Sequence, residues 1–208
     1  MDFSNYIVPI YVDGDYNGTG FIICNTLITA AHVAIKKDNE CHFLYRGKEM
    51  IVGPENNILF EYPNDEIKQG QDNLYWDLAI YRLDNINSPI KLIEPILADY
   101  CIYHGYSDST SRMDTYRDIK LDNNAYYYPP KYDAKPIRIN NCYISEKGRC
   151  SHGNSGGPLF QGDCVIGMLS GGQKWHNLSW DRIIKAEHIL KKIHEYDSNT
   201  PSHKATDR

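Results

Sequence analysis

The chain has 208 residues, of which 41% are hydrophobic and 24% charged. This composition excludes a wholly disordered chain, a collagen and a coiled coil, and one all-β domain commonly reaches this length. The 22 Lys and Arg against 27 Asp and Glu leave a net charge of -5, which gives no electrostatic reason to expect nucleic acid or a membrane as a partner. The 17 Tyr, 15 Gly and 10 Pro favour β structure with many turns.

The start of the chain lacks the basic and apolar regions of a secretory signal. No stretch approaches the ~18 consecutive apolar residues of a membrane span. We therefore expect a cytoplasmic, intracellular protein whose 6 cysteines are mostly reduced, partly buried thiols. No C-x-x-C pair is present, which argues against a zinc site at Cys142, Cys150 and His152.

Short apolar runs bounded by turn residues predict strands along most of the chain. In the first half, strands are expected at 6–12, 18–24, 27–29, 41–45, 49–52, 57–61 and 78–83. Pro9 places the first of them at the edge of its sheet, and residues 30–34 fit one helical turn. After a connector that begins at Ser88, a second group of strands is expected near 99–105, 137–144, 157–161 and 164–170.

Two segments interrupt or end this pattern. Residues 106–135 are polar and rich in tyrosine, too long for a hairpin, and are expected to form an extended loop with partial strands. Ser179 is a suitable helix N-cap, and helical spacing follows it. The sequence thus predicts a C-terminal helix over 179–196 and a disordered tail over 197–208.

Three segments carry residue types that serve nucleophilic catalysis: His32 follows an apolar run, Asp77 opens another, and Ser155 lies in Gly153–Pro158. A serine hydroxyl needs a base within hydrogen-bond reach, an imidazole can accept and return a proton near neutral pH, and a carboxylate fixes its tautomer. Each segment alone fits a structural histidine, a turn aspartate or an ordinary loop, but the three together point to a catalytic triad.

Two other readings of the serine motif fail. Gly153-Asn154-Ser155-Gly156-Gly157 also fits the G-x-S-x-G elbow of α/β-hydrolases, but the preceding residues are polar, Gly-Gly-Pro cannot readily begin a helix, and the triad order is wrong. A cysteine nucleophile fails because position 155 is serine and Cys150 lies five residues too early.

In the order His, Asp, Ser, the three motifs resemble those of the chymotrypsin-like (trypsin-like) serine proteases over about residues 6–196. The resemblance implies an all-β fold of two six-stranded antiparallel β-barrels, 1–95 and 96–178, followed by the C-terminal α-helix. It assigns His32, Asp77 and Ser155 as the triad, and the amides of Gly153 and Ser155 as the oxyanion hole. It requires no metal or cofactor.

The resemblance also implies which residues bind the substrate. Arg149 falls at the floor of the primary specificity pocket with Cys150 and His152 nearby, and the wall that pairs with the substrate backbone is formed by Ser170, Gly171 and Gly172. A basic floor favours an acidic or polar residue before the cut bond. The alternative is that Arg149 faces solvent and the pocket is neutral.

Three departures from secreted family members point to intracellular bacterial or viral relatives. Asn154 stands where an aspartate pairs with a freed N-terminal amine, Pro9 replaces the glycine of the activated N-terminus, and Val33 replaces the cysteine after the histidine. We therefore expect activity without N-terminal clipping. The expected function is a serine endopeptidase acting on a protein or peptide substrate, with a regulatory protein as a further partner. The alternative is a catalytically silent protease fold that binds or scaffolds.

Overall fold

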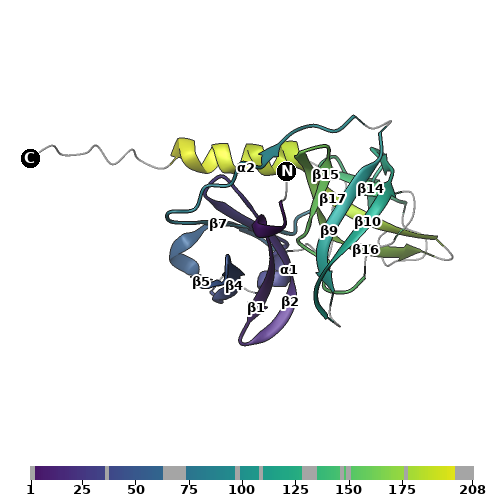
Figure 1. The fold of residues 1–208 in the computed structure, drawn as a ribbon. Helices are drawn as coiled ribbons and strands as arrows, with labels where there is room; N and C mark the ends of the chain where they lie inside the picture. The colour runs from purple at the N-terminus through teal and green to yellow at the C-terminus, as the bar shows by residue number, and fades with distance from the viewer. Residues whose placement is uncertain are drawn as a thin grey trace, which may run out of the picture.

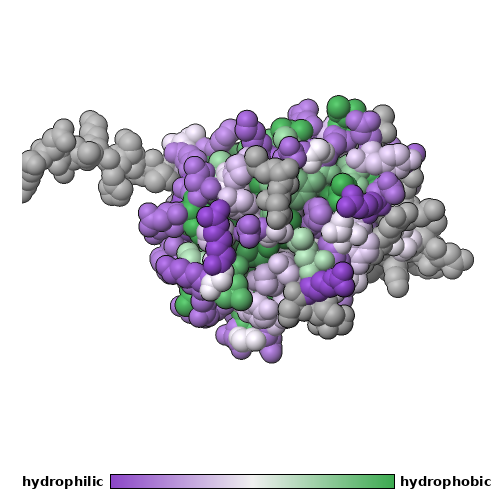
Figure 2. Space-filling model, in the orientation of Figure 1, coloured by the Kyte–Doolittle hydropathy of each residue, from purple (hydrophilic) through white to green (hydrophobic). Residues whose placement is uncertain are grey.

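The computed structural model describes residues 3–35, 38–62, 74–96, 99–107, 110–127, 135–145, 148, 151–175 and 178–199. Two curled antiparallel sheets lie side by side, and a C-terminal helix runs along them (Figure 1). The all-β expectation is therefore confirmed. Hydrophilic side chains cover most of the face drawn in Figure 2. None of the helices within these ranges is long and apolar enough to cross a membrane.

The first sheet contains seven of the described strands in the order β5-β4-β1-β2-β3-β7-β6. Their bounds are β1 Ile7–Val12, β2 Asp15–Ile23, β3 Thr26–Thr29, β4 Cys41–Tyr45, β5 Lys48–Val52, β6 Asn57–Glu61 and β7 Leu78–Arg82, with short helices at Ser4–Tyr6, Ala31–Ala34 (α1) and Pro54–Asn56. The expected edge position of the first strand is wrong, because β1 lies between β4 and β2. Pro9 is tolerated there because the β1–β4 ladder begins only at Ile10.

The second sheet contains eight of the described strands, in the order β10-β9-β15-β16-β17-β14-β11 with β8 paired to β16. Their bounds are β8 Lys91–Leu92, β9 Cys101–Ser107, β10 Thr110–Ile119, β11 Leu121–Asp122, β14 Cys142–Ser145, β15 Pro158–Gln161, β16 Cys164–Trp175 and β17 Leu178–Lys185. A separate pair is formed by β12 Tyr126–Tyr127 and β13 Ile137–Arg138. The two sheets thus hold seven and eight strands, where six each were expected.

Two expectations for the second half need correction. Residues 106–135 were expected to hold only partial strands within an extended loop, but Thr110–Ile119 is a strand of 10 residues that pairs with β9 as a hairpin. The C-terminal helix α2 spans Ala186–Asn199, seven residues later than the expected start at Ser179, and it includes the first residues of the expected tail. Leu178–Lys185 forms a strand instead because it pairs with β16 on one side and β14 on the other. The other expected tail residues, 200–208, lie outside the described ranges.

One apolar core joins the two sheets. The larger cluster of buried side chains takes Ile10 and Phe21 from the first sheet, Val165 and Met168 from the second, and Ile189 from α2. A smaller cluster around Tyr103 belongs to the second sheet alone. Because buried apolar area is the main stabilising contribution in a core, the shared cluster fixes the two sheets against each other.

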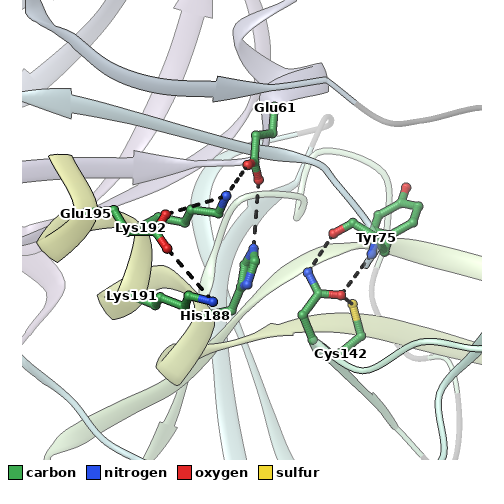
Figure 3. Close-up of polar contacts among 8 residues, drawn as sticks. Glu61, Tyr75, Cys142, His188, Lys191, Lys192 and Glu195 are labelled. Carbon is green, nitrogen blue, oxygen red and sulfur yellow. Dashed lines mark hydrogen bonds and ion pairs between the residues drawn. The ribbon is translucent and has the colours of Figure 1, made fainter. Parts of the chain in front are cut away.

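Helix α2 is also tied to the first sheet by charge (Figure 3). The Lys192 ammonium lies 2.7 Å from Glu61 Oε1 in β6, and His188 Nε2 lies 3.8 Å from the other oxygen of the same carboxylate. Burial raises the pKa of Glu61, but the close contact with Lys192 and the charges of Lys192 and His188 outweigh it and hold this pKa below its usual value.

Candidate active site

His32 and Asp77 meet at one end of the first sheet. His32 lies in α1, which follows β3, and Asp77 directly precedes β7. Because β3 and β7 are paired, with Thr29 opposite Ala79, the two residues come to the same end of these strands. His32 Nδ1 lies 3.0 Å from Asp77 Oδ1 and 2.8 Å from Oδ2.

The carboxylate holds the ring in one tautomer. Asp77 is fully buried, whereas the His32 side chain is 37% exposed. An ionised carboxylate only accepts hydrogen bonds, so the His32 proton belongs on Nδ1 and Nε2 remains an acceptor. The main-chain amide of His32 also donates to Asp77 Oδ1 at 3.0 Å, which fixes the backbone as well as the ring.

Ser170 adds a further donor to this carboxylate. Its hydroxyl donates to Asp77 Oδ2 at 2.5 Å from a position that is 2% exposed. The sequence assigned Ser170 to the substrate-binding wall, and no local pattern showed this contact across 93 positions of the chain. The buried carboxylate therefore accepts from the His32 amide, the His32 ring and Ser170, so both of its oxygens have hydrogen-bond partners in a buried place.

The segment that contains Ser155 comes from the second sheet but lies against the first. The Thr19 amide in β2 donates to the Ser155 carbonyl at 2.8 Å. Gly156 has a φ of +85°, and a Cβ added there would lie 2.0 Å from the Thr19 carbonyl oxygen. A Cβ on Gly18 would lie 2.6 Å from Val33 Cγ2 and 2.9 Å from the Ser155 carbonyl oxygen. Glycines at these positions let the serine segment approach the residues next to His32.

The hydroxyl of Ser155 lies beside β16, next to the residue that bonds Asp77. Its Oγ is 3.8 Å from the position of a Cβ on Gly171, the residue after Ser170. Both His32 and Ser155 lie in the described part of the chain, and their side chains are not joined by a hydrogen bond there. The structure thus brings the three candidate triad residues into one region and joins two of them.

The main chain around Gly153 leaves two amides available. Within the described ranges, neither the Gly153 nor the Ser155 amide donates a hydrogen bond. The Gly153 carbonyl is held by the Tyr16 hydroxyl at 2.7 Å and the Thr19 hydroxyl at 3.1 Å, which fixes the peptide that follows Gly153. Two amides in a fixed loop are the groups that stabilise a developing oxyanion when they point to it.

A scan against protein-family models and a search of curated proteins give no match. Solved structures do match. The active form of the Rv3671c protease of M. tuberculosis aligns with a TM-score of 0.67 at 16% identity, over 96% of this chain and 84% of that one. Neuropsin, a serine protease of mouse brain, aligns at 0.60 and 15%, over 94% and 96%. The scabies mite inactivated protease paralogue S-I1 aligns at 0.62 and 15%, over 95% and 96%.

The chain has the chymotrypsin-like fold. The two sheets are the two half-barrels of this fold, and the resemblance drawn from the three motifs is supported at the level of structure. In the chymotrypsin-like order, the first barrel supplies His32 and Asp77, and the second supplies Ser155 and Ser170.

Asn154, which departs from the secreted members of the chymotrypsin-like family, is fully buried. Its Oδ1 accepts from the Ser151 amide at 2.7 Å and from the Ser151 hydroxyl at 3.0 Å. Its Nδ2 donates to the Tyr106 carbonyl at 2.7 Å, and its own carbonyl accepts from the Tyr103 hydroxyl. These partners satisfy the neutral amide within the second barrel.

The expected substrate-binding residues are placed only in part. Arg149 and Cys150 lie outside the described residues, His152 and Gly172 are exposed, and Gly171 is half-buried. Sequence reasoning missed Asp181. It lies opposite Gly172 in the β16–β17 pair, is 2% exposed, and its Oδ1 is 3.9 Å from the position of a Cβ on Gly172. Only strand register brings these two residues together, so the sequence held no local signal for it.

The cysteines of the described ranges are free thiols: Cys24, Cys41, Cys101, Cys142 and Cys164. Burial raises the pKa of Cys41 and Cys101 to about 11 and that of Cys142 to about 12. These three thiols keep their protons at neutral pH, and only a thiolate is a strong nucleophile or metal ligand.

Proposed function

We propose that this protein is a serine endopeptidase that cleaves peptide bonds through an acyl-enzyme. The observation that carries the proposal is the His32–Asp77 pair, in which a buried carboxylate fixes one ring nitrogen and leaves the other as an acceptor. The serine segment is held against the same end of the first barrel by the Thr19–Ser155 bond. This combination is what activation of a serine hydroxyl by a histidine base requires.

In the proposed mechanism, Ser155 Oγ attacks the carbonyl carbon of the substrate while His32 Nε2 takes its proton. Asp77 stabilises the resulting imidazolium, and the Gly153 and Ser155 amides donate to the oxyanion of the tetrahedral intermediate. His32 then returns the proton to the departing amine. Water, deprotonated by His32, attacks the acyl-enzyme and restores free Ser155. The bond between Ser155 and His32 forms when substrate binds, since catalytic hydrogen bonds often tighten only in the complex.

We further propose that the enzyme acts without N-terminal clipping. In secreted relatives, an aspartate before the serine awaits a new amine, whereas the Asn154 side chain already has its partners. Ile7 begins β1, is 2% exposed and lies opposite Phe21. If clipping produced a new amine at Ile7, this residue would have to leave the strand before the amine could pair elsewhere. The intact protein and a version that starts at Ile7 should be compared. Activity confined to the shorter version would contradict the proposal.

Two charged side chains lead to opposite expectations for the substrate residue that precedes the cut bond. Arg149 favours an acidic or polar residue, whereas Asp181, beside Gly172, favours a cationic one. A peptide library that varies this residue distinguishes them, with Arg149→Ala and Asp181→Asn as the paired variants. The substitution that changes the preference identifies the determinant. The cytoplasmic location and the regulatory partner stay predictions.

The function is tested by mapping new N-termini after the protein is mixed with a complex peptide library, with Ser155→Ala as the matched control. We expect cleavage by the wild type and none by the variant. The alternative is a silent binding or scaffold module, as the inactivated mite paralogue illustrates for its own fold. Folded wild-type protein that produces no more cleavage than Ser155→Ala would favour that alternative.

A further inference from the structure

The Asn154 carbonyl belongs to the same peptide bond as the Ser155 amide. In a planar trans peptide the carbonyl and the N–H point in opposite directions, so a donor that fixes the carbonyl also fixes the direction of the amide. The Tyr103 hydroxyl is such a donor, and it reaches the Asn154 carbonyl across 51 positions of the chain. Tyr103 therefore acts on one of the two amides of the proposed oxyanion hole.

The Tyr103 side chain is held in one place. Tyr103 is fully buried in β9, where it lies opposite Leu159 of β15. Its ring centroid lies 5.9 Å from that of Tyr116 in β10. Because a buried ring in a close-packed interior has little room to move, its hydroxyl keeps a defined direction.

Two glycines leave the space that this hydroxyl occupies. A Cβ on Gly105, in the same strand, would lie 1.8 Å from Tyr103 Oη, and a Cβ on Gly157 would lie 2.3 Å from it. Neither of these glycines has a positive φ, so the backbone conformation does not call for glycine there. The close approach of the Tyr103 phenol does.

Strand β9 holds Asn154 at a second point. Asn154 Nδ2 donates to the Tyr106 carbonyl at 2.7 Å, so both the side chain and the main chain of Asn154 are bonded to this strand. The Gly157 amide also donates to the Asn154 carbonyl, at 3.1 Å. That bond closes the turn 154–157 upon itself, whereas the bond from Tyr103 joins the turn to the sheet.

We propose that Tyr103 is a positioning residue of the oxyanion hole: its hydroxyl holds the Asn154 carbonyl and so directs the Ser155 amide toward the oxyanion. The effect on catalysis rests on the proposed endopeptidase function, whereas the effect on the Asn154–Ser155 peptide does not. Tyr103 touches no reacting atom. Because the oxyanion exists only after the attack of Ser155 begins, a misdirected amide lowers kcat and not the binding of substrate.

The first test compares Tyr103→Phe, which keeps the ring, with the wild type. We expect kcat to fall about tenfold, less than the 10²- to 10³-fold loss of a whole oxyanion donor, with KM unchanged. The matched control is Tyr81→Phe: Tyr81 is also fully buried, and its hydroxyl lies 3.9 Å from the Cys41 thiol in the first barrel. That variant should keep the wild-type kcat. An unchanged kcat in Tyr103→Phe, or an equal fall in both variants, would overturn the proposal.

A reversible inhibitor separates a positioning role from a general loss of structure. Ser155 Oγ adds to the carbonyl carbon of a peptide aldehyde, and the serine proton passes to the aldehyde oxygen, which lies where the oxyanion would. The matching peptide alcohol has no carbonyl and forms no such adduct. Tyr103→Phe should weaken the aldehyde by the same factor as kcat/KM and leave the affinity for the alcohol unchanged. Equal weakening of both would overturn the positioning role.

A third test needs no turnover. A hydrogen bond to a carbonyl moves its ¹³C resonance downfield, so the Asn154 carbonyl resonance should move upfield in Tyr103→Phe and stay in place in Tyr81→Phe. An unmoved resonance in Tyr103→Phe would overturn the contact on which the positioning role depends. The expected shift in a protein whose wild type cleaves no peptide would overturn the endopeptidase function alone.

Discussion

The two barrels contribute to the candidate site in different ways. The first barrel presents a finished acid–base pair, since His32 and Asp77 are joined by ring and main-chain bonds. The second barrel presents Ser155 on a segment held by its backbone, with no side-chain bond to His32. The proposed base is therefore held within one barrel, whereas the position of the proposed nucleophile depends on contacts between the barrels. Substitutions should separate these two requirements.

The largest effect is expected within the finished pair. Asp77→Asn can present an amide N–H to His32 and so favours the wrong tautomer, which leaves Nε2 protonated and unable to act as a base. We expect kcat to fall by about 10³- to 10⁴-fold with little change in KM. Steady-state kinetics on a peptide substrate measures this, and a fall of less than about tenfold would show that the pair is not the base system.

The next effect concerns the contact between the barrels. Gly156→Ala places a Cβ 2.0 Å from the Thr19 carbonyl oxygen at a φ of +85°, so the serine segment must move away from the first barrel. We expect activity to fall more than about 100-fold, since small displacements of reacting groups cost that much. Gly162→Ala is the control, because Gly162 also has a positive φ but no atom within 4 Å of the added Cβ. If both variants lost the same activity, the close contact between Gly156 and Thr19 could not be the cause.

A smaller effect is expected from Thr19. Its hydroxyl donates to the Gly153 carbonyl and accepts from the Tyr106 amide at 2.8 Å. Thr19→Val keeps the shape but leaves buried polar groups without that partner, which costs about 1–3 kcal/mol of unfolding free energy. We expect activity to fall about tenfold as the Gly153 peptide loosens. Thr26→Val, the same change at another buried threonine of the first sheet, in β3, should retain activity. Denaturant unfolding measures the loss of unfolding free energy in Thr19→Val, and steady-state kinetics compares the activity of the two variants.

The smallest effect lies far from the triad, at Glu61. Because its folded pKa lies below the usual value of 4.5, its charged form stabilises the fold above that pH. This contribution is lost as pH falls through the folded value. Glu61→Gln should therefore lower the melting temperature at pH 7, with the difference from wild type shrinking at acid pH and activity retained. Glu195→Gln is the control, since Glu195 is 50% exposed. If the melting temperature of Glu61→Gln lies as far below that of the wild type at pH 3 as at pH 7, the stabilising role of the charged Glu61 is contradicted.

The sequence predicted what is encoded locally. The three motifs, the strands around them and the all-β class depend on neighbouring residues, so they could be recognised without a structure. The length of β10 was underestimated because it lies at the edge of its sheet, where a polar composition resembles a loop. The helix was placed too early because Leu178–Lys185 is paired on both sides and shows no clear alternation of burial.

The supporting contacts of the site could not be predicted from the sequence. Ser170 meets Asp77 across 93 positions, Asn141 meets Tyr75 across 66, and Thr19 meets Gly153 across 134. Each contact depends on how the barrels are placed against each other, which no local pattern describes. These are the contacts that position His32, Asp77 and Ser155, so a triad found by motif alone is only part of the site.

The central claim is that Ser155 is a nucleophile activated by His32. Its most direct measurement is the intact mass of the folded protein after treatment with a fluorophosphonate, followed by peptide mapping of the adduct. The account predicts one adduct, on Ser155, that is absent in Ser155→Ala and strongly slowed in His32→Ala. A folded wild-type protein that gains no adduct, or gains it on another residue, would contradict the account.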